Sequence, residues 1–364
     1  MAVRLRSILL GLLVAALVAA PSAAAGRGLL VGVDDDQAKW IGHPMVLLPV
    51  YKELGVKAVR VNAHWKPGES SVAGSDWVMV HRVTVATWGL RLVLAVDGPA
   101  SQPPLDDASR GQYCNYVASI VQSFPSIHDV VIWTEPNNPT FWRPQAGAAA
   151  GYEALLARCW DTLHAVSSSV NVIAASAPHA KPIAWYLALG DAYRKSGRTR
   201  PIFDTVGHNA YPQTSAESPA AVHTGDVIDE GDYGRFMQVL QQAFGGTAQP
   251  IPGQNGVTIW YMEDGFQSRI VYGRNLYTGA ETDKFALDEQ QQGRQLAAAV
   301  RLAYCQPNVG AFFNFELRDE TVLKGWQSGV VRADWSPKPS YFMFRDAIID
   351  ALRGNVDCSQ FGLK

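Results

Sequence analysis

Short apolar segments alternate with longer amphipathic segments along almost the whole chain, and this alternation restricts the fold more than any other feature. The short segments have the length of buried strands, and the longer ones have helical spacing. Parallel strands need a helical crossover between them, so about eight such repeats predict a single α/β domain, a (β/α)8 TIM barrel. The competing doubly wound sheet predicts fewer repeats and usually a Gly-rich first turn, which Val33-Asp34-Asp35-Asp36 does not provide.

Apolar runs and helix-ending residues predict the element boundaries. Strands are expected at 29–33, 57–62, 90–96, 130–134, 170–175, 203–208, 257–262 and 309–315. Helices are expected at 44–54, 76–88, 106–124, 147–168, 182–195, 233–244, 286–304 and 339–352. Gly55 and Gly89 follow the first two helices, where glycine commonly ends a helix.

The N-terminus has the pattern of a secretion signal. Arg4 and Arg6 precede an apolar run at 8–20, and Ala23-Ala24-Ala25 offers a cleavage site. We therefore expect a signal peptide at 1–25 and a secreted barrel domain at 26–364. The apolar run is short for a transmembrane helix, so no membrane contact is expected after cleavage, and a retained N-terminal anchor is the alternative.

Charge and length narrow the partners and the number of domains. Loss of Arg4 and Arg6 changes the formal net charge from -2 to -4, and the chain has no basic block, so neither nucleic acid nor an anionic membrane surface is an expected partner. The 364 residues, 48% of them hydrophobic, suffice for one barrel or two smaller domains. The chain has no Pro/Ser/Gly-rich linker, which favours one domain, and we expect a monomer.

The cysteines are widely spaced, and none of them forms a pair at metal-ligand spacing. In an exported protein Cys114, Cys159, Cys305 and Cys358 predict two disulfides, for which three connectivities exist. We favour Cys114 with Cys159, on consecutive predicted helices, and Cys305 with Cys358, which would fix the C-terminal tail. Free buried thiols are the alternative.

Two glutamates follow predicted strands. The strand at 130–134 stops at Glu135-Pro136, where proline removes the next ladder donor, and Glu263 follows the strand at 257–262. Alone, Glu135 would more simply cap a turn or pair with an arginine. In a parallel barrel, however, both strand ends face one mouth. Facing carboxyl groups can divide the acid and nucleophile roles that glycosidic bond cleavage needs, at about 5 to 5.5 Å for retention and roughly 6.5 to 9.5 Å for inversion.

The motifs around these glutamates resemble those of the clan A retaining glycoside hydrolases. Trp133-Thr134-Glu135-Pro136-Asn137 looks like their W-N-E-P-N signature, and Tyr261-Met262-Glu263-Asp264-Gly265 resembles their strand-seven nucleophile segment. Family 39 and the family 5-like endoglycanases have the nearest pattern. The resemblance covers most of the mature chain as a strand pattern, although its specific motifs are short. It implies Glu135 as general acid/base and Glu263 as nucleophile.

The resemblance also implies roles at other strand ends. Arg60 matches a strand-two arginine that touches the nucleophile, and its charge would keep Glu263 ionised. His208 and Tyr211 lie in a segment similar to the strand-six motif, so Tyr211 would donate to Glu263 and His208 to a sugar hydroxyl. Asn137 would orient the Glu135 loop. Without the resemblance, each of these residues has a plainer role in an ion pair, a structural contact or an Asx turn.

One position departs from the family motif. Thr134 stands where the family has an asparagine that binds the sugar 2-hydroxyl, and threonine is shorter and lacks the amide donors. Three explanations are open. The substrate is unusual at C2, or catalysis is weakened, or another asparagine makes the contact, the candidates being Asn62, Asn209 and Asn314.

Aromatic residues gather on the predicted rim loops, where their rings suit the C–H faces of sugars. They are Trp65, Phe141, Trp142, Phe266, Tyr272, Tyr277, Trp326 and Trp335. About half of such a set is ordinary packing under loops. Phe141, Trp142 and Trp326 are the favoured sugar subsites, and Trp142 and Trp326 join Arg60, Asn137, His208 and Tyr211 as the expected substrate-binding residues.

Neither a metal nor a cofactor is expected. Acidic residues at other strand ends would line the groove, bind a cation or form turns, and these are Asp34, Asp35, Asp36, Asp97 and Glu316. The histidines have neither H-x-H nor H-E-x-x-H spacing. The chain also has no G-x-S-x-G motif and no phosphate-binding Gly loop, so a serine hydrolase is not indicated.

The sequence therefore predicts a secreted retaining glycosidase that acts on a β-linked poly- or oligosaccharide. One alternative is a catalytically silent barrel that binds glycan. Another is a cell-wall transglycosylase with the same site. A fold does not decide among these functions.

Overall fold

The computed structural model describes residues 26 and 28–363, and it is a closed barrel of eight parallel strands in the order β1 to β8. The predicted fold class is thereby confirmed. The strands are β1 (Leu30–Asp34), β2 (Ala58–His64), β3 (Arg91–Asp97), β4 (Asp129–Ile132), β5 (Asn171–Ala174), β6 (Thr205–Asn209), β7 (Thr258–Asp264) and β8 (Val309–Phe315). The barrel closes where β1 pairs in parallel with β8.

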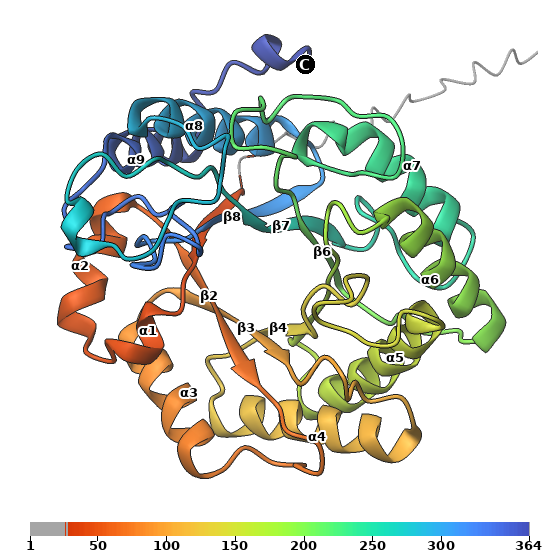
Figure 1. The fold of residues 1–364 in the computed structure, drawn as a ribbon. Coiled ribbons are helices and arrows are strands. Elements are labelled where there is room, and N and C mark those ends of the chain that lie inside the picture. The colour runs from red at the N-terminus through yellow and green to blue at the C-terminus, as the bar shows by residue number, and fades with distance from the viewer. Residues whose placement is uncertain (1–25, 27, 364) are drawn as a thin grey trace, which may run out of the picture.

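Helices surround the barrel on its outside (Figure 1). They are α1 (Gln37–Trp40), α2 (Pro44–Leu54), α3 (Gly74–Ala86), α4 (Asp107–Ser123), α5 (Ala148–Val166), α6 (Pro182–Ser196), α7 (Tyr233–Phe244), α8 (Glu289–Cys305) and α9 (Pro339–Arg353). Short 3₁₀ turns lie at Glu230–Asp232, Arg274–Leu276 and Cys358–Phe361. Helix α1 was not predicted, because four residues are too few to show helical spacing.

The strand pattern places one set of side chains inside the barrel and the alternate set under the helices. In β3, Val93 and Ala95 belong to the inner cluster, whereas Leu92 and Leu94 belong to the outer cluster between sheet and helices. This is the two-residue period of a strand. Along β2 and β3, the residues that continue the inner row beyond the packed core are Asn62 and Asp97, so they face the barrel mouth.

Capping residues in the sequence fix where these helices begin and end. Helix α2 ends at Gly55, which has a φ of 82°, a conformation that glycine adopts without a steric penalty. Helix α4 begins after Asp106, whose carboxylate accepts from the backbone N–H of Ser109 at 2.8 Å. Both ends lie within one residue of the predicted boundaries, because the sequence carries the capping residues themselves.

Both favoured disulfides are present. Cys114 in α4 is bonded to Cys159 in α5, and Cys305 at the end of α8 is bonded to Cys358 in the C-terminal 3₁₀ turn. The second bond therefore holds the C-terminal segment against α8. The predicted signal peptide at 1–25 lies outside the described residues. Among the residues that are described, no helix has the length and apolar character needed to cross a bilayer.

Candidate active site

Glu135 and Glu263 line the same cavity, which has a volume of about 670 Å³. Other lining residues come from the carboxyl ends of the strands, among them Asn62 of β2, Asp97 of β3 and Phe315 of β8. The cavity therefore lies at the barrel mouth, where the loops that follow the strands meet. The closed barrel brings together two carboxylates that are 128 positions apart in the sequence.

The chain turns sharply out of β4 to present Glu135. Strand β4 ends at Ile132, two residues earlier than predicted, because Trp133 has a φ of 63° and Glu135 a φ of 39°. Positive φ is unfavourable for residues other than glycine and needs support from the surrounding structure. The fully buried Trp133 provides that support, since its backbone N–H donates to Val96 at 2.9 Å and its indole N–H to Phe141 at 2.8 Å.

Two amide groups hold the Glu135 carboxyl. Asn209 Nδ2 donates to Oε1 at 2.7 Å, and Asn138 Nδ2 donates to Oε2 at 2.8 Å. Burial and the nearby Glu263 charge raise the pKa of Glu135 to about 7, against the two amide donors and Arg60, which lower it. A carboxyl with this pKa can hold a proton near neutral pH and release it during a reaction.

Glu263 has a different environment, in which a charged arginine and a tyrosine hydroxyl contact its carboxyl group. Arg60 Nη1 lies 2.6 Å from Glu263 Oε1, and the Tyr211 hydroxyl donates to Oε2 at 3.0 Å. The same Arg60 nitrogen contacts Asp34 of β1. Burial alone would lower the pKa of Arg60, but the Asp34 and Glu263 carboxylates raise it above its usual value, so the guanidinium stays charged. Glu263 thus has a charged arginine and a hydroxyl donor as partners, one on each carboxyl oxygen.

The two glutamates are thus suited to opposite tasks. Glu135 is buried beside the Glu263 charge, and both effects favour its protonated form over the carboxylate that its two amide partners favour. Glu263 contacts a guanidinium and a phenol hydroxyl, which both donate to it. Paired carboxyl groups whose environments differ in this way are the arrangement that acid and nucleophile roles require.

His208 does not reach the cavity, contrary to the prediction that it binds a sugar hydroxyl. Its ring is fully buried, with Nδ1 at 2.7 Å from Ser176 Oγ and Nε2 at 2.8 Å from the carbonyl oxygen of Ile228. Burial lowers the pKa of His208 to about 4. Both ring nitrogens are therefore engaged by the protein, and His208 joins β6 to its neighbouring segments.

Trp142 is also fully buried, so the prediction that it forms a sugar subsite is wrong. Its ring packs edge-on against Trp133, with the centroids 5.3 Å apart and an interplanar angle of 75°. The residue thus supports the strained turn before Glu135. Three other predicted rim aromatics are buried, namely Trp65, Phe266 and Tyr277.

Trp326 and Phe141 do line the cavity. Trp326 packs beside Tyr211 with the ring centroids 5.2 Å apart and an interplanar angle of 30°, and Phe315 contacts both rings. These three rings form the aromatic wall of the cavity. Tyr211 and Trp326 also line an adjoining cavity of about 300 Å³. The aromatic wall therefore extends from the carboxylates into a second space.

Asn137 connects two rim loops and does not line the cavity that holds the glutamates. Its side-chain amide donates to the carbonyl oxygens of Ala177 at 3.0 Å and Ala180 at 3.1 Å, and its oxygen accepts from the Ala177 N–H at 2.8 Å. The loop after β4 is thereby fixed to the segment after β5.

The site also contains residues to which the sequence motifs give no role. Asn138 is one, and its place three residues after Glu135 allows the local contact with that carboxyl group. Three asparagines are candidates for the sugar contact that Thr134 lacks. Of these, Asn209 donates to Glu135, and Asn314 Nδ2 donates to the Glu316 carbonyl oxygen at 2.6 Å. Asn62 lines the cavity. The Thr134 hydroxyl is buried without a hydrogen-bond partner.

Among the described residues, one group has the composition of a metal site. Donor atoms of Glu217, His223 and Asp229 lie within 4.8 Å of one another. However, His223 Nε2 is 3.0 Å from Glu217, and Nδ1 is 2.8 Å from Asp232. Both ring nitrogens thus already face carboxylates on opposite sides of the imidazole, and we interpret the group as an ion-pair network.

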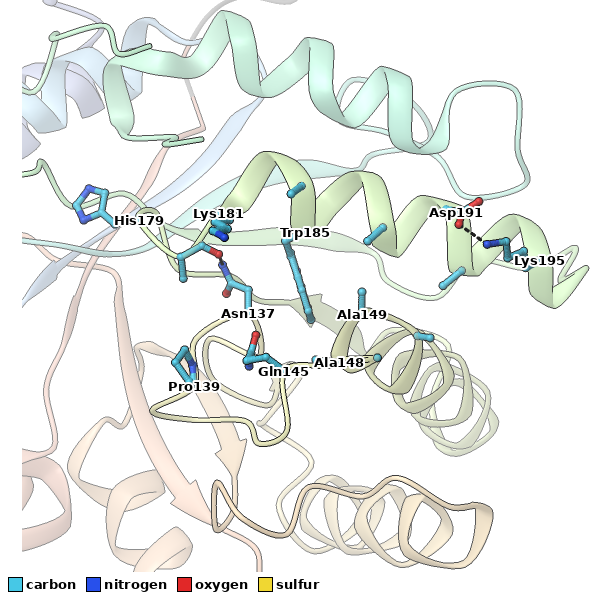
Figure 2. Close-up of a pocket in the computed structure, with 16 residues that line it drawn as sticks. Asn137, Pro139, Gln145, Ala148, Ala149, His179, Lys181, Trp185, Asp191 and Lys195 are labelled. Atoms are coloured by element: carbon cyan, nitrogen blue, oxygen red, sulfur yellow. Dashed lines mark hydrogen bonds and ion pairs between the residues drawn. The ribbon is translucent and has the colours of Figure 1, made fainter. Parts of the chain in front are cut away.

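A further cavity, of about 640 Å³, lies between α5 and α6 (Figure 2). Trp185 and several alanines, such as Ala148 and Ala149, line it, and the Lys195–Asp191 ion pair lies at its far end. Among the described residues that line it, Asp191 is the one carboxylate, so this cavity has no pair of facing carboxyl groups.

No family model and no curated protein matches the chain. Among solved structures, the chain is similar to a family 39 glycoside hydrolase from Bacteroides cellulosilyticus, with a TM-score of 0.64 and 16% identity over 91% of this chain and 64% of that one. The GH53 catalytic domain of Ignisphaera aggregans gives a TM-score of 0.60 and 14% identity, over 88% of this chain and 96% of that one.

A GH2 β-galacturonidase from Eisenbergiella tayi, bound to galacturonate, gives a TM-score of 0.54 and 12% identity, over 90% of this chain and 51% of that one. The chain thus spans less than two thirds of the family 39 protein and about half of the galacturonidase. At these identities the similarity shows a shared fold, the barrel on which these glycoside hydrolases are built.

Proposed function

We propose that the protein is a secreted glycoside hydrolase that cleaves a β-linked poly- or oligosaccharide with retention of configuration. The observation that carries this proposal is the contrast between two glutamates in one cavity. Glu135 has a pKa raised to about 7, and Glu263 is held by Arg60 and Tyr211. Secretion is supported by the two disulfides, which persist in oxidising compartments.

In the first step Glu263 attacks the anomeric carbon while Glu135 protonates the departing oxygen. Arg60 and Tyr211 orient the attacking carboxylate. Once Glu263 is esterified, its negative charge is gone and no longer raises the pKa of Glu135. Glu135 is then better suited to accept a proton from water, which hydrolyses the glycosyl-enzyme.

The stereochemistry of the first product tests this mechanism. The protein is incubated with β-linked polysaccharides, and the anomeric protons of new reducing ends are followed by NMR before mutarotation. A β-anomer as the initial product is expected. An α-anomer would require an inverting reaction and would exclude a covalent intermediate on Glu263.

Thr134 favours one second function, a barrel that binds glycan without cleaving it. Threonine is shorter than the asparagine of the family motif and lacks the amide donors that would bind the sugar 2-hydroxyl. The two functions differ in their products. Binding of a polysaccharide with no new reducing ends at any pH would favour the silent barrel, and a longer product made with an added acceptor would indicate transglycosylation.

A further inference from the structure

The cavity of the two glutamates is lined by acidic groups and by no described lysine or arginine. Asp97, Glu135 and Glu263 contribute carboxyl groups to its wall. The adjoining cavity behind Tyr211 and Trp326 adds Asp283, again with no lysine or arginine among the described residues. A sugar ring that occupies either space meets carboxyl groups and aromatic rings.

Arg60 is not available to a ligand. It is 1% exposed, it is not part of the cavity wall, and its Nη1 is already in contact with both Asp34 and Glu263. One positive charge is therefore shared between two carboxylates. Arg60 balances part of the negative charge at the site, but its burial keeps its donors from an anionic group on a substrate.

The two nearby histidines each contact a carboxylate of the protein. His64 contacts Asp97, but its side chain is 67% exposed and does not line the cavity. His179 does line the cavity, and its Nε2 lies 2.8 Å from Asp229. Each imidazole thus already has a carboxylate partner. A carboxylate on a bound sugar would lose hydration without meeting a lysine or arginine among the described residues that line either cavity.

From this charge distribution we infer that the sugars bound at the barrel mouth are uncharged or carry an ammonium group, and that uronic acid glycosides are rejected. The inference rests on the proposed function for the place where the glycan binds. An ammonium group supplies donors only and suits a wall that carries Asp97 and Glu263 beside Glu135, which holds a proton near neutral pH. A uronate adds a like charge, which at an effective dielectric constant of about 20 weakens binding on the order of tenfold or more.

Binding of three chain-matched ligands tests the inference on the unsubstituted protein. These are β-1,4-linked tetrasaccharides of glucose, of glucosamine and of glucuronic acid, measured by calorimetry at a pH where the amines are protonated and the uronates ionised. We expect the glucosamine ligand to bind at least as tightly as the glucose ligand, and the glucuronic acid ligand about tenfold or more weakly. Added salt should weaken binding of the glucosamine ligand.

Asp97→Asn should reduce the discrimination between the glucose and glucuronic acid ligands, because it removes one carboxylate from the wall. Asp107→Asn, at an exposed position on α4, is the matched control and should leave the discrimination unchanged. The inference is overturned if the glucuronic acid ligand binds as tightly as the others, or if none of the three binds. Products in the same samples are followed by chromatography, so selective binding without cleavage would reject the proposed hydrolase and leave the inference in place.

Discussion

Arg60 on β2 and Glu263 on β7 meet across the barrel mouth, with Nη1 2.6 Å from Oε1. Asp34 on β1 shares the same guanidinium. Three strands therefore meet at one buried charge cluster, and the proposed nucleophile is part of it. The chemistry and the stability of the site are linked through this arginine, and the first two predictions separate the two.

Replacement of Glu263 by Gln should abolish turnover and preserve the fold. The amide is nearly isosteric but cannot attack the anomeric carbon, so we expect a loss in kcat of about 10³-fold or more, measured with an aryl β-glycoside. Glu281→Gln on the exposed loop after β7 is the matched control. Activity within a few-fold of the unsubstituted protein would remove Glu263 from the mechanism.

Replacement of Arg60 by Ala should destabilise the protein, because Asp34 is then left buried without its cation. Breaking a buried pair in this way costs about 3–5 kcal/mol, which urea unfolding would measure. Arg345→Ala, which breaks an ion pair between partly exposed side chains on α9, should cost about 1 kcal/mol or less. Equal losses in the two variants would mean that the buried cluster has no special role in stability.

The pH dependence of activity should show an alkaline limb near pH 7. Glu135 must be protonated to act as an acid, and its pKa is raised to about 7, so kcat/KM falls as the pH rises through that value. Asn209→Ala removes a donor that favours the carboxylate and should move the limb to higher pH. Asn355→Ala, at an exposed position beyond α9, is the control. If the alkaline limb stays at the same pH in Asn209→Ala, a group other than Glu135 causes it.

Replacement of Trp326 by Ala should raise KM more than it lowers kcat. The indole forms the aromatic wall with Tyr211 and borders both cavities, so its loss removes a sugar-packing surface away from the reacting bond. We expect an increase in KM of about tenfold on oligosaccharides. Trp335→Ala serves as control, because Trp335 packs on Arg318 and does not line the cavity. An unchanged KM would place the sugar elsewhere.

The Cys305→Ser/Cys358→Ser variant should lose stability without losing catalysis. Cys305 ends α8, which precedes β8, so the bond lies at the opposite end of the barrel from the cavity. In the chain-entropy model a bond that closes a loop of this length contributes about 4 kcal/mol to the free energy of unfolding. Urea unfolding measures the loss, and kcat at a temperature where the variant is folded measures the activity. A large drop in kcat would contradict the separation of the two regions.

The sequence predicted the barrel well because the periodicity of strands and helices is a local property. It can be recognised in the sequence without knowing which residues are in contact. It also predicted that Glu135 and Glu263 share one mouth, since parallel strands end at one side of a barrel. Cys114 and Cys159 could be paired because they lie on consecutive helices. In each case the topology alone fixed which residues meet.

The errors arose where the direction of a side chain decides its role. His208 lies in β6 and is predicted to bind a sugar hydroxyl, but its ring contacts Ser176 and Ile228 instead. Trp142 lies on a rim loop, but that loop folds its indole against Trp133. Neither orientation follows from periodicity. The amide donors Asn138 and Asn209 depend on the positive φ of Glu135, which the sequence does not reveal.

The cluster of Asp34, Arg60 and Glu263 also has a consequence for the evolution of this barrel. A descendant that lost Glu263 would lose the chemistry, yet selection for a stable fold would still retain Arg60, because Asp34 remains buried and needs a cation. Arg60 would then be retained after the proposed reaction had been lost. In sequences that share this arrangement, the arginine alone is a marker of a stable barrel, and activity has to be judged from the two glutamates.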